Sequence, residues 1–263
     1  MMDMYARVHS VESFGCDDGW GIRYIVFLAN CGMRCSYCAN IDVACGRFTK
    51  LMKPQDVINE MNKSREFYIQ NKGGLTLSGG ECLLHMDWCI ETAKLAKENG
   101  YTVAIDTCGD CPSKDLSKLP TLLQYVDLVL MDFKAFDSRR HIMLTGKNNN
   151  GIINVMNLIT ESGVETWIRH VVINGTNTDK GGDEDFINIC RYIARNLTTV
   201  TQLDLLPFHN MAQSKWEEMK LEYKHSDDSV PTEEQMIHRL EVAKELFTLY
   251  GRNIVVTRWQ IVV

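Results

Sequence analysis

Three cysteines in one short segment constrain this chain more than any other feature. Cys31, Cys35 and Cys38 directly follow the apolar run 22–28, which is typical of a β-strand. Structural zinc sites usually draw their cysteines from two separated pairs, whereas these three come in one burst. A cubane iron–sulfur cluster normally takes four Cys thiolates, one for each iron. The three thiolates therefore favour a 4Fe–4S cluster with one open iron, and the alternative is three thiols without any ligand.

Composition decides how the ten cysteines of the chain are interpreted. No apolar run approaches the roughly 18–20 residues that span a bilayer, and residues 1–7 lack the pattern of a signal peptide. We therefore expect a cytoplasmic protein, in which cysteines are thiols or metal ligands rather than disulfides. The net charge of −6, without a basic block, argues against a nucleic-acid groove, and no membrane partner is expected.

The other cysteines are scattered, apart from the pair Cys108 and Cys111, which are separated by two residues. A redox pair or a second cluster is one interpretation of this pair. The two-cluster spacing of ferredoxins is absent, which favours ordinary free thiols.

Strand-like and helix-like segments alternate six times, at a spacing of roughly 25–35 residues, which indicates βα units and a parallel sheet. The expected strands are 22–28, 74–78, 102–107, 126–132, 165–173 and 202–207. The expected helices between them are 54–70, 86–99, 116–123, 152–162 and 185–195. A capping box that begins at Thr232 starts a final helix to about Tyr250, and the apolar tail 253–263 is expected to be extended.

Six units are fewer than the eight of a closed barrel. We therefore expect an α/β fold, a partial (β/α)6 TIM-like barrel that is open on one side. It forms a single domain, residues 1–263, with a core at about 20–210. N- and C-terminal extensions flank this core, and the C-terminal helix and tail cover about 231–263.

Polar residues stand where the expected strands end, which is where parallel α/β folds bind ligands. Gly79 and Gly80 lack a Cβ and let a ligand approach the backbone, while Glu81 can accept a hydrogen bond from an ammonium group. Asp106 and Asp132, with the hydroxyl of Thr107 between them in sequence, can offer oxygen ligands to a hard cation. The alternative for each carboxylate is a capping or turn role.

Two further strand-end residues are basic. Arg169 lies within an apolar strand and needs a partner, either a substrate carboxylate or, as an internal salt bridge, one of the aspartates. His209 follows the sixth strand and can donate to a nucleoside hydroxyl, unless it is an ordinary surface histidine.

The cysteine spacing, with Tyr37 before the last cysteine, resembles the radical S-adenosylmethionine (radical SAM) superfamily. Within it, the chain is similar to the activases of glycyl radical enzymes, in particular those of pyruvate formate-lyase. This resemblance covers essentially the whole chain. It rests on the motifs Arg7–Ser10, Glu12–Ser13, Asp18–Arg23, Ser78–Glu81, Asp106–Thr107, Asp132–Lys134, Trp167–Arg169 and Leu205–His209.

The resemblance implies a radical SAM type of fold and specific roles for the residues of these motifs. Cys31, Cys35 and Cys38 would hold the 4Fe–4S cluster. SAM would lie against or near Tyr37, Cys38, Ala39, Gly79, Gly80, Glu81, Asp132, Phe133, Lys134, Arg169 and His209. A monovalent cation (Na⁺ or K⁺) would bind Asp106, Thr107, the main chain of Leu130 and Asp132. The partner enzyme would contact Asp18 and Arg23.

The implied activity is reductive cleavage of SAM and abstraction of a glycine Hα from the partner, pyruvate formate-lyase, under anaerobic conditions. A flavodoxin or ferredoxin would supply the electron, and the activase would be a monomer. Trp20, Ala39 and Asn174 depart from the residues that this family more often has, and Trp20 and Asn174 lie in loops that can contact the partner. The alternatives are an activase of another glycyl radical enzyme, a small-molecule enzyme such as a deazaguanine synthase, and a non-catalytic metal-binding or electron-transfer protein.

Overall fold

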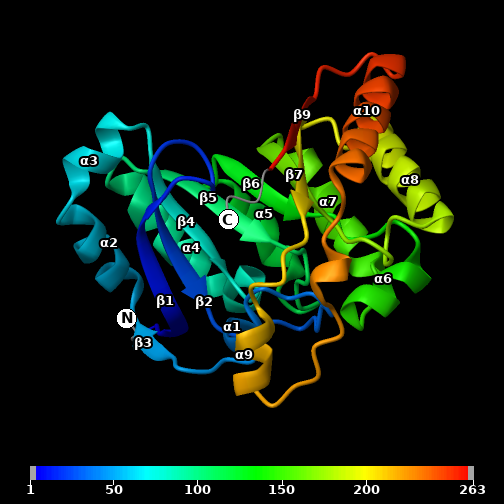
Figure 1. Ribbon diagram of the computed structural model, residues 1–263. Helices are drawn as coiled ribbons and strands as arrows, with labels where there is room; N and C mark the ends of the chain where they lie inside the picture. Colours follow the sequence, from blue (N-terminus) through cyan, green and yellow to red (C-terminus); the bar gives the residue numbers. More distant parts are fainter. Residues whose placement is uncertain (1–3, 260–263) are drawn as a thin grey trace.

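A computed structural model describes residues 4–259 of the chain, which fold around one nine-stranded sheet (Figure 1). The strands follow the order β3-β1-β2-β4-β5-β6-β7-β8-β9 across this sheet. Their bounds are β1 Ala6–Gly15, β2 Arg23–Leu28, β3 Lys50–Met52, β4 Gly74–Gly79, β5 Thr102–Thr107, β6 Leu128–Asp132, β7 Glu165–Val172, β8 Val200–Pro207 and β9 Val255–Arg258.

The six expected strands are β2, β4, β5, β6, β7 and β8, and each is parallel to its neighbour. β9 extends this parallel run beyond β8, while β1 and β3 add an antiparallel edge beside β2. Within residues 4–259 the edge strands β3 and β9 do not pair with each other, so the sheet is open. The prediction of an α/β fold with a partial, open barrel is confirmed.

Helices occupy the connections between the strands and cover the sheet from outside (Figure 1). The helices are α1 Ile41–Ala44, α2 Pro54–Asn62, α3 Arg65–Gln70, α4 Met86–Glu98, α5 Leu119–Leu123, α6 Ser138–Thr145, α7 Asn150–Ser162, α8 Lys180–Asn196, α9 Gln213–Glu218 and α10 Glu233–Leu249. Their apolar faces bury residues at helical spacing, as Ile152, Val155, Met156 and Ile159 of α7 show. The core therefore lies between this helical layer and the sheet.

The final helix begins where the capping box predicts. The Thr232 hydroxyl accepts from the Gln235 N–H at 3.2 Å, and the Gln235 side chain accepts from the Thr232 N–H at 2.8 Å. β9 confirms the expectation of an extended tail as far as Arg258, and the rest of that prediction, residues 260–263, lies outside the described residues.

One expectation about a helix is wrong in detail. The segment 54–70 is two helices, because α2 ends at Asn62 and α3 starts at Arg65 after Lys63 and Ser64. Asn and Ser are poor helix formers, which favours an interruption there. The short elements α1, α6, α9 and β3 were not predicted at all.

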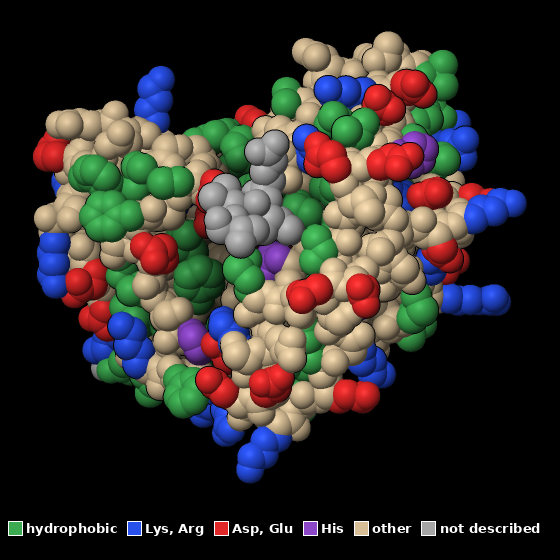
Figure 2. Space-filling model, viewed as in Figure 1, with side chains coloured by type: hydrophobic (Ala, Val, Ile, Leu, Met, Phe, Trp, Pro, Cys, Tyr) green, Lys and Arg blue, Asp and Glu red, His purple; other side chains and the backbone are tan. Residues whose placement is uncertain are grey.

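Charged side chains of both signs are interspersed over the face seen in Figure 2. This mixture leaves no extended basic surface on that face, in line with the acidic net charge of −6. Among the described helices, none has both the length and the apolar character that crossing a membrane requires.

Candidate active site

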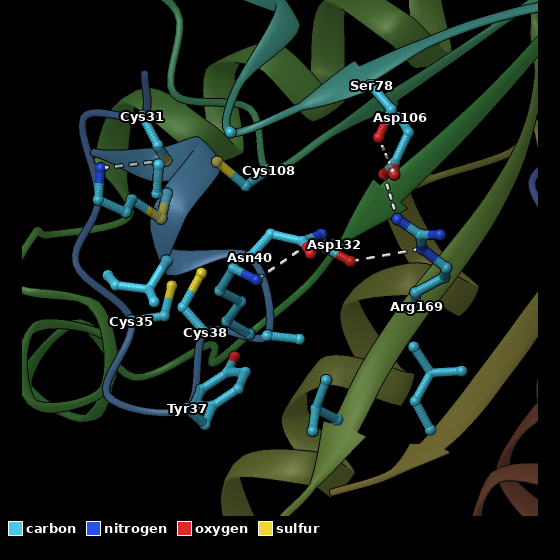
Figure 3. A pocket seen from close by; sticks show the side chains of 18 of the residues that line it. Cys31, Cys35, Tyr37, Cys38, Asn40, Ser78, Asp106, Cys108, Asp132 and Arg169 are labelled. Carbon is cyan, nitrogen blue, oxygen red and sulfur yellow. Dashed lines mark hydrogen bonds and ion pairs between the residues drawn. The ribbon is translucent and has the colours of Figure 1, made fainter. Parts of the chain in front are cut away.

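A cavity of about 680 Å³ lies at the carboxyl ends of the parallel strands (Figure 3). Its volume falls in the range of about 300–1,000 Å³ that small-molecule and cofactor sites occupy. Most of the site residues expected from the sequence line it. They are Asp18, Cys31, Cys35, Tyr37, Cys38, Ala39, Gly79, Gly80, Asp106, Thr107, Asp132, Lys134, Arg169 and His209. The structure thus brings together residues from the whole length of the chain.

The cysteine loop, residues 31–38, is held in place by the short helices that the sequence analysis missed. The N–H groups of Arg34 and Ser36 donate to the carbonyls of Thr145 and Leu144 at the end of α6, at 2.8 and 2.9 Å. On the other side, the Trp216 indole N–H of α9 donates to the Cys38 carbonyl at 2.9 Å. The loop is therefore anchored in its middle and at its last cysteine, and its backbone is fixed before any cofactor binds.

Burial and a contact between thiols shift the pKa values of the three cysteines in opposite directions. Burial raises the pKa of Cys38 to about 12 and also raises that of Cys35, while contact with the Cys108 thiol is the main cause that lowers the pKa of Cys31. Metal binding requires thiolates and releases their protons. The iron ions of a bound cluster would therefore stabilise the deprotonated form of these cysteines, which burial disfavours.

Within residues 4–259, no three His, Cys, Asp or Glu side chains converge on a point where one metal ion would bind. The thiols therefore do not all point at a single position, as a zinc site would require. Ligands of a cubane cluster each bind a different iron, so this spread fits a cluster better than a single ion.

Arg169 lies at the centre of a network of carboxylates (Figure 3). Its guanidinium pairs with Asp106 and lies 3.5 Å from Asp132 Oδ1 and 3.9 Å from Asp18 Oδ1. Residues of β7 alternate in direction, which places Arg169 on the cavity side while Ile168 and His170 are buried on the helix side. Of the two alternatives left open for Arg169, the internal salt bridge is the one present.

The buried charges in this network support one another. Burial favours the neutral form of Asp132, but Lys134 and Arg169 hold its pKa below its ordinary value. Lys134 Nζ lies 3.0 Å from Asp132 Oδ2 and 5.5 Å from the centroid of the Tyr37 ring. A positive charge therefore stands beside the cysteine loop, where it offsets the charge of a thiolate-bound cluster.

In this network, the negative charge of Asp18 is the one that neighbouring positive charges stabilise least. Burial is the main cause that raises its pKa to about 6, with a further contribution from Asp106 that exceeds the opposing effect of Arg169. Its folded pKa lies above its unfolded value, so ionisation as the pH rises from about 4 to above 6 destabilises the folded state.

We expect Asp18→Asn to stabilise the protein at pH 7.5 and to leave its stability unchanged near pH 4. The carboxamide has nearly the same shape without the unfavourable charge, and the gain should be on the order of 2–3 kcal/mol. Thermal unfolding of the two proteins at both pH values measures this difference. Asp17→Asn, at the exposed neighbouring position, is the control. Equal melting temperatures of Asp18→Asn and the parent chain at pH 7.5 would contradict this assignment.

Gly79, Gly80 and Glu81 make their closest contacts with the protein itself, whereas a bound ligand is the partner expected for them. A Cβ on Gly79 would lie 2.1 Å from the Leu28 carbonyl oxygen, and one on Gly80 would lie 2.3 Å from that of Asn30. These glycines therefore let the end of β4 pack against the end of β2 and the residues that lead into the cysteine loop, although they also border the cavity.

Glu81 is 1% exposed and lies behind the cavity wall. Its carboxylate accepts from the N–H groups of Leu83 and Cys108 and from the Thr107 hydroxyl, at 2.6–2.9 Å. In the structure it therefore accepts from the protein's own groups rather than from an ammonium group in the cavity.

Other predicted residues also face away from the cavity. Arg23 is 1% exposed and donates to the hydroxyls of Thr76 and Thr102, at 2.9 and 2.7 Å. Arg23 therefore does not lie on the rim of the cavity, where a residue that contacts a partner is expected, because its guanidinium satisfies polar groups inside the sheet. Phe133 is also buried, against Phe136 and Tyr192, so its side chain faces the helices.

The four residues expected to bind a cation have other partners in the structure. Asp106 accepts from the Ser78 hydroxyl at 2.8 Å and pairs with Arg169, while Asp132 pairs with Lys134. The Thr107 hydroxyl donates to Glu81, and the Leu130 side chain packs in an apolar cluster with Trp20 and Trp167.

Two buried polar groups suggest what the cavity accepts. His209 Nδ1 has no hydrogen-bond partner among the described residues, although His209 lines the cavity. Arg169 Nε likewise lacks a hydrogen bond there, since its 3.5 Å approach to Asp132 is an ion pair of poor geometry. Orphaned groups of this kind are usually satisfied by a ligand or water. The cavity thus offers polar contacts for a molecule such as SAM, beside three thiols that suit a cluster.

Known proteins share both the sequence and the fold. The family described as the radical SAM superfamily matches residues 25–193. A relative from Listeria monocytogenes, named pyruvate formate-lyase-activating enzyme, is 40% identical over 238 residues, which are 89% of this chain and 94% of the relative. One of the same name from Clostridium pasteurianum is 34% identical over 240 residues, 91% of this chain and 98% of the relative.

Among solved structures, Streptococcus suis SuiB bound to the precursor peptide SuiA has a TM-score of 0.66 at 13% identity. The match covers 96% of this chain and 50% of that one, and it shows a shared fold. The family match spans the cysteine loop and the strands β3 to β7, and the two relatives match 89% and 91% of the chain. The chain therefore belongs to the radical SAM superfamily, in the family of the pyruvate formate-lyase-activating enzymes.

Proposed function

We propose that this chain activates pyruvate formate-lyase by generating a glycyl radical on it, with a 4Fe–4S cluster and SAM as cofactors. The observation that carries this proposal is the position of the three cysteines of one loop. They line the same cavity as Lys134, the Arg169 network and His209, whose Nδ1 has no hydrogen-bond partner among the described residues. The relatives at 34–40% identity are named for this activity.

The chain's own residues position the cofactors. Cys31, Cys35 and Cys38 are the proposed cluster ligands, and the helices that anchor the loop fix their backbone. When bound, the cluster supplies the electron for cleavage of SAM, which leads to abstraction of the glycine Hα. Lys134 lies over the Tyr37 ring beside the cysteine loop, and His209, which also lines the cavity, offers its Nδ1 to SAM. This arrangement orients the reacting groups and excludes competing reactions.

The open side of the sheet is the proposed entry for the glycine segment of the partner enzyme. Asp18 lines the cavity with a side chain that is 26% exposed, so it is the candidate for contact with this segment. The structural relative SuiB is named for binding a precursor peptide, and it has the same fold. A cavity at an open sheet is therefore a plausible geometry for an extended peptide.

Several finer assignments belong to the same proposal. A monovalent cation, Na⁺ or K⁺, would bind at Asp106, Thr107, Leu130 and Asp132, provided that Asp106 and Asp132 release Arg169 and Lys134 in part. We further propose a cytoplasmic monomer with one domain, residues 1–263, that takes its electron from a flavodoxin or ferredoxin.

Electron paramagnetic resonance tests the cofactor assignment directly. We expect the anaerobically prepared, reduced protein to show the signal of a reduced 4Fe–4S cluster, and we expect this signal to change when SAM is added. The change reports a ligand at the open iron. His209→Gln, which keeps a polar side chain at that position, should weaken SAM binding without removing the cluster signal. A cluster signal that SAM does not alter would contradict the proposed function.

A further inference from the structure

The loop 108–111, which follows β5, carries the cysteine pair that the sequence analysis left without a role. Cys108 is 7% exposed and lines the cavity, whereas Cys111 is only partly buried and lies outside the cavity lining in the described part of the chain. Figure 3 shows the Cys108 sulfur directed toward Cys31, the first cysteine of the triad. The two cysteines of the pair therefore occupy different environments, and only Cys108 faces the proposed cluster.

The Cys108 thiol lies between two acceptors. Its sulfur lies 2.8 Å from Glu81 Oε2 and is directed toward Cys31 (Figure 3). Its backbone N–H also donates to Glu81 Oε2, at 2.8 Å, which fixes the residue against the carboxylate. Glu81 is itself held by the Leu83 N–H and the Thr107 hydroxyl, so Cys108 has little freedom to move away from Cys31.

Glu81 does not depend on the Cys108 thiol for its hydrogen bonds. Three other donors, two backbone N–H groups and the Thr107 hydroxyl, already satisfy the carboxylate. A thiol has one proton, so it can serve only one of its two acceptors at a time. When Cys31 is a cluster-bound thiolate, its sulfur carries the charge of the cluster and competes for that proton.

The same loop approaches the backbone next to Cys31 through a second contact. Lys147 Nζ lies 2.8 Å from both carboxylate oxygens of Asp110. A Cβ on Gly32, next to Cys31, would lie 2.0 Å from Asp110 Oδ2 and 2.6 Å from Lys147 Nζ. The ion pair is therefore packed directly against Gly32, and a side chain at this position would displace it.

We propose that the loop 108–111 positions and shields the Cys31 corner of the cluster. Cys108 donates a thiol hydrogen bond to the Cys31 sulfur, and the Asp110–Lys147 ion pair closes the outer side over Gly32. This inference rests on the proposed cluster site and adds two residue contacts that act on it. Cys108 is a positioning residue, because it acts through Cys31 rather than on the substrate.

A hydrogen bond to a cluster sulfur stabilises the reduced, more negative state of the cluster and raises its reduction potential. Removing the donor should therefore make the cluster harder to reduce. We expect Cys108→Ala to lower the ratio of reduced to oxidised cluster at a fixed potential by roughly threefold to tenfold. Tenfold corresponds to a shift of about 59 mV for one electron.

The measurement is a redox titration of the cluster-loaded protein, followed by its electron paramagnetic resonance signal, with iron content determined on the same samples. Cys111→Ala removes a thiol from the same loop but not from the cavity. The reduction potential of its cluster should therefore equal that of the parent chain. Cys108→Ser keeps a hydrogen-bond donor, so the reduction potential of its cluster should be close to that of the parent chain. Full iron content with an unchanged potential in Cys108→Ala would overturn the inference, while a parent chain that binds no iron would instead overturn the proposed function.

A second variant tests the shielding role of the Asp110–Lys147 ion pair and leaves every cysteine in place. Lys147→Met keeps an aliphatic chain but breaks the ion pair with Asp110 over Gly32. We expect its cluster to bleach several-fold faster than that of the parent chain when air is admitted. Lys118→Met, which removes an exposed lysine paired with Asp87 and Asp115, is the matched control. Equal bleaching rates in Lys147→Met and the parent chain would contradict the shielding role.

Discussion

Replacing Cys35 with alanine is expected to remove the cluster and to lower radical formation on pyruvate formate-lyase at least about a hundredfold. Loss of an outer-shell partner of a metal ligand already costs roughly 10- to 100-fold, and loss of a ligand should cost at least as much. Cys35 is also the most enclosed of the three proposed ligands. Iron and sulfide content, together with the visible absorption of the cluster, measure the loss before any activity is assayed.

Cys45→Ala is the matched control for this substitution. Cys45 lies close to the triad in sequence, but it packs beside Ile41 and Trp216 and lies outside the cavity lining in the described part of the chain. Its removal should therefore leave the iron content unchanged. A full complement of iron in Cys35→Ala, or its loss in Cys45→Ala, would show that the ligands have been assigned wrongly.

Replacing Arg169 with methionine is expected to destabilise the protein by about 3–5 kcal/mol, because breaking a buried pair leaves uncompensated charges. Asp106, Asp132 and Asp18 all lie within 4 Å of this guanidinium in the structure, and the side chain of Arg169 is only 13% exposed. The destabilisation should lower the melting temperature by roughly 6–15 °C, measured anaerobically on the cluster-loaded protein.

A double-mutant cycle separates the lost charge from the lost packing. Asp106→Asn in the Arg169→Met background removes one of the stranded carboxylates, so it should recover part of the stability. The same substitution in the parent chain should be destabilising, since Asp106 then has its partner. If the two effects of Asp106→Asn were equal, the ion pair between Arg169 and Asp106 would have no energetic role.

The sequence predicted the sheet well because parallel strands have strong local signals. The buried run 126–132 and the capped helix from Thr232 were recognisable from composition and spacing alone. α6 was missed, although Asp137 accepts from the Arg140 N–H at its start and Gly146 has a φ of 78° at its end. These start and stop signals were present in the sequence and were not used.

Other features depend on contacts between distant segments, which no local pattern carries. Gly79 was interpreted as making room for a ligand, but its neighbour is the backbone of Leu28, and only the register of β2 against β4 reveals this. The resemblance implies that Arg23 contacts the partner enzyme, yet Arg23 starts β2 and its side chain is directed inward to Thr76. The contact of Cys108 with Cys31 likewise joins residues that are far apart in sequence.

The central claim is that this chain places a glycyl radical on pyruvate formate-lyase. The most direct measurement is anaerobic incubation of the cluster-loaded protein with SAM, a reductant and pyruvate formate-lyase, followed by electron paramagnetic resonance. We predict the doublet of a glycyl radical, with the amount of radical falling to background in Cys35→Ala. Cleavage of SAM without any protein radical, in the presence of an otherwise activatable partner, would contradict the account.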